Sequence, residues 1–210
     1  AFGVVDGQVS LDGGFFPRPV PLSSTGWRTD RPPGDLCVRL QVALKKPRGG
    51  ALIVNGDLRM VSGEETRHSF SVGCAQRVSL LWLPGAQTFR HRARGTEVEV
   101  VHRRRRHELP PEDTLPDLSA LDTHGLAAEA AASAVGYLKA RWPNADSRVL
   151  LVETPLRRRI AEWAPGMVLL SDRAFTVTPL SHLQSLHEQD IARAVFTGSL
   201  APTLHQRETV

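Results

Sequence analysis

A strict alternation of apolar and other residues over positions 36–44 is the feature that most constrains the first half of this chain. The apolar residues take every second position: Leu36, Val38, Leu40, Val42 and Leu44. Successive side chains of an extended strand point to opposite faces, whereas a helix would spread these residues around its axis. The pattern therefore predicts a β-strand with one buried face.

Several more short strands follow in the first hundred residues. The apolar run 51–54 ends at Asn55-Gly56, a dipeptide that is typical of a two-residue hairpin turn. Other strands are predicted over residues 66–72, 78–83, 88–94 and 97–102. Short strands at intervals of about ten residues, separated by turn residues, are typical of an antiparallel sandwich. We therefore expect an antiparallel β-sandwich domain over residues 1–103.

A basic run, Arg103 to His107 (RRRRH), follows these strands. Nucleic-acid-binding segments often have such a charge pattern, but this run has no interleaved aromatic residues, and an acidic, proline-rich stretch follows it at once. We interpret it as a solvated strand end that leads into a linker over residues 104–122, and we do not expect a nucleic-acid partner. A basic interaction module that uses Arg103–Arg106 and Arg157–Arg159 is the alternative.

The composition changes after the linker. Residues 125–142 are rich in alanine and predict a helix that ends before Pro143-Asn144. Two continuous apolar runs follow, Val149–Val152 and Met167–Leu170, and residues 174–178 could extend the second. Runs of this kind are typical of strands that are buried on both faces. We therefore predict an α+β protein, in which the sandwich is followed by a smaller α/β unit over residues 123–210.

A second helix is predicted over residues 181–196. Leu183, His187, Ile191 and Ala194 recur at spacings of four, four and three residues, which places them on one apolar stripe. Ser181 can cap the start of this helix, and Gly198 can end it. We expect the helix to pack beside the sheet that holds the two apolar strands, with His187 and Ile191 turned inward.

The overall composition excludes few functions. The net charge is +4, and hydrophobic residues make up 41% of the chain, which is enough for a buried core. No apolar run reaches the roughly 18 residues that a membrane-spanning helix needs. Cys37 and Cys74 could form a disulfide across neighbouring strands, but nothing requires it, so they do not indicate a cellular compartment. Because the chain begins at Ala1 without an initiator Met, we expect it to be a piece of something longer.

Read in order, the pieces of the chain resemble the aminopeptidase N-like gluzincin metallopeptidases, from the end of their N-terminal β-domain to the start of their thermolysin-like catalytic domain. The resemblance covers most of the chain and depends on the order of short segments. These segments are Phe16–Trp27, Leu36–Gly56, Glu64–Val101, Asp146–Pro155 (DSRVLLVETP), Ala164–Ser171 (APGMVLLS) and His187-Glu188 with Ala192–Phe196.

The resemblance implies site residues. His187 stands at the family's first zinc ligand and Glu188 at its general base, where zinc-activated water attacks a peptide carbonyl. The second ligand should lie four residues after the first, because only side chains at i and i+4 converge on one metal, and that position is Ile191. The glutamate that binds the substrate's amine would fall at Trp163, with Glu162 one place away.

Two further elements of the family site are also absent or displaced. The third ligand would fall near Glu208, but out of register, and the family's transition-state tyrosine would lie beyond Val210. We therefore expect a non-catalytic, peptidase-like domain or fragment without a cofactor. Its partner would be the remainder of a longer polypeptide or another protein, and a peptide ligand is possible.

The alternative is an active zinc peptidase with an altered or externally completed ligand set. Asp190 follows His187 by three residues, so the two side chains could chelate one ion. His182 lies about 140° around the helix from His187 and could not join it on a straight helix, and His205 is a further candidate. Without a metal, His187 would be a hydrogen-bonded core histidine and Glu188 a solvated helix residue.

Overall fold

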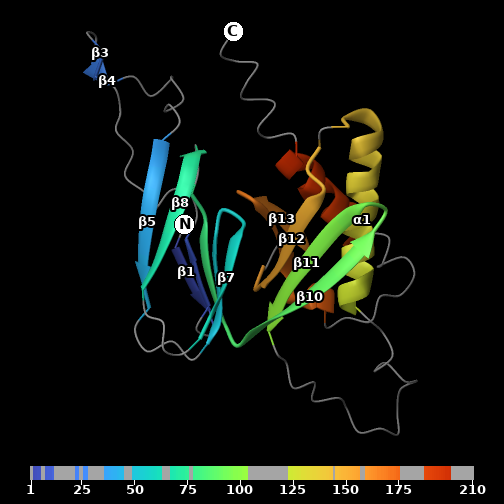
Figure 1. Cartoon of the computed structure of the whole chain (residues 1–210), viewed down its shortest axis with the longest axis horizontal. Helices are drawn as coiled ribbons and strands as arrows, with labels where there is room; N and C mark the ends of the chain where they lie inside the picture. Colours follow the sequence, from blue (N-terminus) through green and yellow to red (C-terminus); the bar gives the residue numbers. More distant parts are fainter. Residues whose placement is uncertain are drawn as a thin grey trace, which may run out of the picture. The chain divides into compact units, whose positions relative to one another are not determined.

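The computed structural model shows a mixed α and β protein that consists mostly of sheets (Figure 1). It divides into two compact units, Ala1–Gly85 and Ala86–Val210. The structure describes residues 2–5, 8–11, 22–23, 26–27, 36–44, 49–62, 67–75, 78–103, 123–143, 145–156, 159–175 and 187–199. None of the helices in these ranges is long and apolar enough to cross a lipid bilayer.

The strands of the first unit form antiparallel sheets, as the alternating patterns predict. The largest has five strands in the order β1-β2-β9-β6-β7, and two-stranded sheets pair β5 with β8 and β3 with β4. The bounds are β1 Phe2–Val5, β2 Gln8–Leu11, β3 Leu22–Ser23, β4 Gly26–Trp27, β5 Leu36–Ala43, β6 Gly50–Val54, β7 Asp57–Val61, β8 Arg67–Ala75 and β9 Leu80–Pro84. Cys37 and Cys74 lie on the paired strands β5 and β8.

A hydrophobic core lies between the five-stranded sheet and the β5–β8 pair. Leu52 and Val54 of β6 belong to the same buried cluster as Phe70 and Val72 of β8, and Leu40 of β5 packs against it. Residues from both sheets therefore share one core, which is the packing of a sandwich. The predicted hairpin turn is present: Asn55 and Gly56 have φ angles of 46° and 83°, and Ser79 N donates a 2.7 Å hydrogen bond to Asn55 Oδ1.

Gly50 is required where β6 passes β9. Its φ is +158°, and a Cβ at this position would collide with the backbone carbonyl oxygen of Leu83 and lie 2.9 Å from Pro84 Cα. Gly50→Ala combines backbone strain with overpacking, so it should lower the free energy of unfolding by about 3 kcal/mol or more. Gly85→Ala is the control, because a Cβ there meets nothing within 4 Å and only the positive φ of 64° costs about 1 kcal/mol. Chemical denaturation of the two variants checks this, and equal losses would contradict the collision.

The second unit is built on a five-stranded mixed sheet in the order β10-β11-β12-β14-β13. The strand bounds are β10 Ala86–Ala93, β11 Thr96–Arg103, β12 Arg148–Thr154, β13 Ala161–Ala164 and β14 Met167–Ser171. Strands β11, β12 and β14 are parallel, while β10 and β13 run antiparallel at the two edges. The prediction that the two apolar strands Val149–Val152 and Met167–Leu170 share one sheet is confirmed.

The predicted domain boundary was wrong. The segments 88–94 and 97–102, which we placed in the sandwich, form β10 and β11 of the second unit, and the units divide after Gly85. The physical reason is the parallel ladder between β11 and β12, in which Val98 lies opposite Val149 and Val100 opposite Leu151. The expected linker, residues 104–122, lies outside the described residues.

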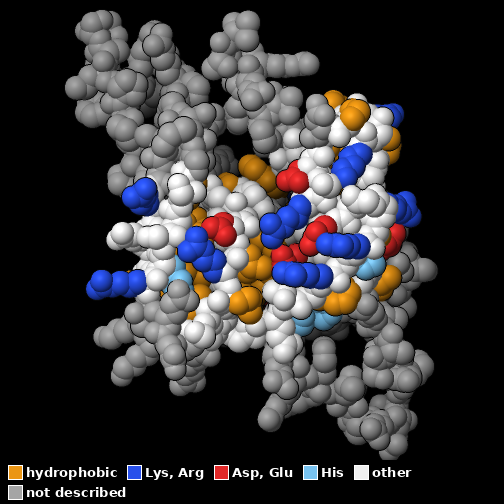
Figure 2. Space-filling model, in the orientation of Figure 1, with side chains coloured by type: hydrophobic (Ala, Val, Ile, Leu, Met, Phe, Trp, Pro, Cys, Tyr) orange, Lys and Arg blue, Asp and Glu red, His pale blue; other side chains and the backbone are white. Residues whose placement is uncertain are grey.

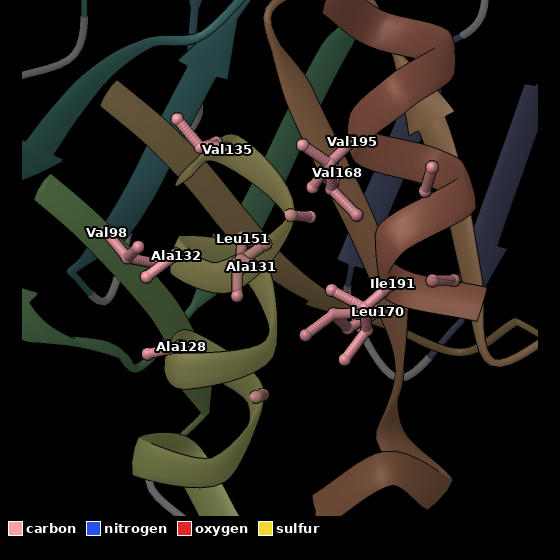
Figure 3. Packing of buried hydrophobic residues seen from close by; sticks show 14 of the residues in the cluster. Val98, Ala128, Ala131, Ala132, Val135, Leu151, Val168, Leu170, Ile191 and Val195 are labelled. Atoms are coloured by element: carbon pink, nitrogen blue, oxygen red, sulfur yellow. The ribbon is translucent and has the colours of Figure 1, made fainter. Parts of the chain in front are cut away.

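Two helices cover one face of this sheet. Helix α1 (Thr123–Arg141) connects β11 to β12, and a second helix spans residues 187–199. The face of α1 that packs on the sheet consists largely of alanines, which let the helix approach closely (Figure 3). Fully buried members of this core include Val98, Val100, Ala128, Ala131, Ala132, Leu151 and Leu170.

Two other segments of this unit differ from expectation. Strand β13 was not predicted, because Ala161–Ala164 is too short and mixed to show a strand pattern. The possible extension of the strand over 174–178 was wrong for its first residues, since Asp172–Phe175 forms a 3₁₀ turn, η2. The remaining residues of that extension lie outside the described residues.

Candidate functional site

The helix over residues 187–199 carries the candidate residues His187, Glu188 and Asp190. Its first described residue is His187, and the predicted start, residues 181–186, lies outside the described part of the chain. His187 is half-buried and Glu188 is exposed. Within the described residues, no hydrogen bond joins the His187 ring to another residue, so the expected bond to a protein group is not seen there.

Ile191, at the position of the missing second imidazole, is 2% exposed. It belongs to the buried core of the second unit together with Ala194 and Val195. Figure 3 shows Ile191 beside Leu170 of β14, one turn of the helix before Val195 meets the same strand. The expectation that Ile191 is packed against the sheet is therefore confirmed. An apolar side chain fills the place that a second ligand would need.

Asp190 has a different partner from the one that a metal site requires. Its Oδ1 lies 3.5 Å from Nη1 of Arg193, three residues further along the helix. The described residues contain no group of three or more His, Cys, Asp or Glu side chains that could hold a metal ion. His182, His205 and Glu208, the other ligands considered from the sequence, lie outside the described residues.

Glu162 lies in the edge strand β13 and is exposed. The next residue, Trp163, lies against Gly198 of the 187–199 helix, where a Cβ would collide with the indole ring. Ala161 belongs to the same core cluster as Ile191. Because side chains alternate along a strand, Ala161 and Trp163 face the helix and Glu162 faces away from it. The structure therefore does not bring Glu162 together with His187 and Glu188.

Sequence reasoning missed a buried carboxylate, that of Glu99 in β11, whose partners come from the neighbouring strands β10 and β12. The Glu99 side chain is 4% exposed and lies between two arginines. Its Oε1 accepts a 3.1 Å hydrogen bond from Arg90 Nε of β10, and its Oε2 a 3.2 Å bond from Arg148 Nη2 of β12. A buried charge needs such partners, because an unpaired one would be costly. Both carboxylate oxygens of Glu99 therefore have arginine donors, one from each neighbouring strand.

Histidines also gather where α1 begins, which no spacing in the sequence indicated. The rings of His102 and His124 have centroids 4.0 Å apart, and His102 Nδ1 donates to the carbonyl oxygen of Arg103 (3.1 Å). His91 Nε2 lies 3.2 Å from Glu129 Oε2. Nearby, Arg103 N donates to the buried carboxylate of Glu153 (2.8 Å). These contacts tie α1 and β12 to the end of the β10–β11 hairpin.

Truncating Ile191 should test its place in the core. Ile191→Ala should lower the free energy of unfolding by about 2–5 kcal/mol and Ile191→Val by about 0.5–1.5 kcal/mol, because the smaller side chains leave a cavity against β14. Gln189→Ala, an exposed position on the same helix, should change it by less than about 0.5 kcal/mol. Urea denaturation measures all three. A loss below about 1 kcal/mol for Ile191→Ala would mean that the helix is not held on the sheet.

Comparison with known proteins does not identify a family for this chain. No protein-family model matches the chain, and no curated protein matches it. What the chain does has to be inferred from its own residues.

Proposed function

We propose that this chain is a non-catalytic relative of the aminopeptidase N-like gluzincin metallopeptidases, and that it acts as an interaction or structural part of a larger protein or complex. In this proposal residues 123–210 of the second unit, from α1 onward, correspond to the start of a thermolysin-like catalytic domain. The helix over residues 187–199 is then the counterpart of the zinc helix, in which His187 and Glu188 remain and the second histidine has been lost.

The observation that carries the proposal is the buried Ile191. A zinc helix needs two imidazoles on one face, four residues apart, with open space in front of them for the metal. Here the second position is 2% exposed and packed in an apolar core. An ion would have to be dehydrated in that core without a ligand from position 191, which is unfavourable.

The order of elements supports the peptidase ancestry. The resemblance expects a strand at Asp146–Pro155, a second strand at Ala164–Ser171 that begins with a Pro-Gly turn, and then the zinc helix. The corresponding elements are β12, β14 with the turn at Pro165-Gly166, and the 187–199 helix. His187 lies one turn before Ile191, on the side of the helix that faces the sheet.

An active zinc peptidase with an altered ligand set is less well supported. It would use Asp190 beside His187, but that carboxylate pairs with Arg193 and is half-buried. One histidine and one carboxylate are too few donors for the three-ligand sites of zinc peptidases. Glu162, the candidate for binding a substrate amine, lies on the opposite face of the sheet from this helix.

Purified protein should therefore carry no stoichiometric zinc. Two protein donors give a weak site that loses its ion on dialysis, because closed zinc sites use four ligands and catalytic ones three. Elemental analysis after loading with zinc and dialysis against metal-free buffer measures this. A content of about one zinc per chain that disappears in a His187→Ala variant would overturn the proposal and favour an active peptidase.

Restoring the missing imidazole should recover zinc binding if the helix descends from a zinc helix. Ile191→His should be less stable than the natural chain without metal, because a buried imidazole lacks partners. Zinc at about 100 µM should then raise its melting temperature by several degrees, since binding to the folded state alone stabilises it. Ile191→Gln, which is equally polar but a poor ligand, should show no such rise, and neither should Ile191→His combined with His187→Ala.

A further inference from the structure

Strand β10 lies at one edge of its sheet, where its outer side has no partner among the described strands, and its exposed side chains have an unusual charge pattern. Among the described strands, only β11 pairs with β10, in an unbroken eight-residue register from Ala86↔Arg103 to Ala93↔Thr96. A straight, regular edge of this length presents a row of backbone N–H and C=O groups with which another extended segment can pair.

The hairpin geometry fixes which residues present these groups. Arg94 and Gly95 form a two-residue turn with φ angles of 52° and 70°, which is a type I′ turn. The pair that closes such a turn, Ala93↔Thr96, is hydrogen-bonded, and hydrogen-bonded pairs then recur at every second residue. The backbone groups of the intervening residues, Thr88, Arg90 and Arg92, therefore point to the open edge.

The side chains of these same residues select a partner. Arg90 and Arg92 are 70% and 82% exposed and lie on one face of the sheet. Both arginines already pair with carboxylates of the neighbouring strand β11: Arg90 lies 3.1 Å from Glu99, and Arg92 lies 3.4 Å from Glu97. Each guanidinium has five N–H donors, so donors remain for a second carboxylate on the outer side.

We propose that the open edge of β10 binds an extended acidic segment of a partner protein, which adds a strand with Asp or Glu at alternate positions opposite Arg90 and Arg92. The surface over β10 and β11 carries interleaved basic and acidic side chains (Figures 1 and 2). A second copy of β10 is disfavoured at this edge, because a two-fold pairing centred on Arg90 would place like charges directly opposite one another.

This inference gives a binding edge to the interaction role proposed above, and it does not involve zinc or the 187–199 helix. A failure to bind peptide would leave the zinc results standing, and a zinc-loaded natural protein would leave the peptide results standing. The two proposals can therefore fail separately.

The test is binding of a fluorescein-labelled peptide with the sequence of residues 96–101, TEVEVV, to the full chain, measured by fluorescence anisotropy at low salt. We expect a dissociation constant below about 100 µM, with at least fivefold weaker binding when both glutamates are replaced by glutamine. Binding should also weaken as salt is raised, because the paired charges are exposed.

Matched variants separate the backbone contribution from the charge. Thr88→Pro removes an outward N–H that the fold does not use, so it should weaken binding about fivefold, whereas Thr88→Ala should have no effect. Arg92→Gln should weaken binding about threefold, and Arg193→Gln, an exposed arginine on the 187–199 helix, should not.

Three outcomes would overturn the proposal. The first is no peptide binding at about 1 mM, and the second is binding that Thr88→Pro leaves unchanged, which would mean attraction without strand addition. The third is tight binding of mixed-sequence duplex DNA at physiological salt that requires Arg92 and outcompetes the peptide, which would assign the arginine row to nucleic acid.

Discussion

The parallel pairing of β11 with β12 is the contact on which the second unit depends. It joins a hairpin, β10–β11, to a strand that lies far along the chain, and a parallel partner can be reached only through a crossover. Helix α1 is that crossover, and its alanine face lets it lie close over Val98, Val100 and Leu151. Without this ladder the hairpin would be an isolated antiparallel pair, and the core under both helices would be open on one side.

Much of the fold could be predicted from the sequence, because its local patterns are strong. The alternation of β5, the Asn55-Gly56 turn, the alanine-rich helix and the apolar strands β12 and β14 all lie close to their expected positions. The domain boundary was missed for a physical reason. A hairpin with one apolar face looks the same in the sequence whether it closes a sandwich or joins a parallel strand, and its partner is set by packing between distant segments.

The candidate site was predictable to a similar extent. The apolar stripe placed Ile191 inward, and it is buried as expected. The faces of an unrecognised strand could not be assigned, so the orientation of Glu162 away from the helix was missed. The buried Glu99 had a usable signal: with the turn at Arg94-Gly95, register alone pairs Arg90 with Glu99. The second partner of Glu99, Arg148, comes from the distant strand β12, and no local pattern in the sequence predicts that pairing.

The turn at Arg94-Gly95 also bears on how the second unit reaches its fold. A two-residue turn joins strands that are neighbours in the chain, so the hairpin can close within microseconds, without waiting for distant segments. The ladder to β12 must wait for the long connection through α1, and such non-local pairings slow folding. During synthesis the hairpin leaves the ribosome before α1 and β12, and it is then available as a template for β12. For that interval both edges of the hairpin are open, and the arginines on β10 discourage pairing with a neighbouring copy on the same messenger RNA.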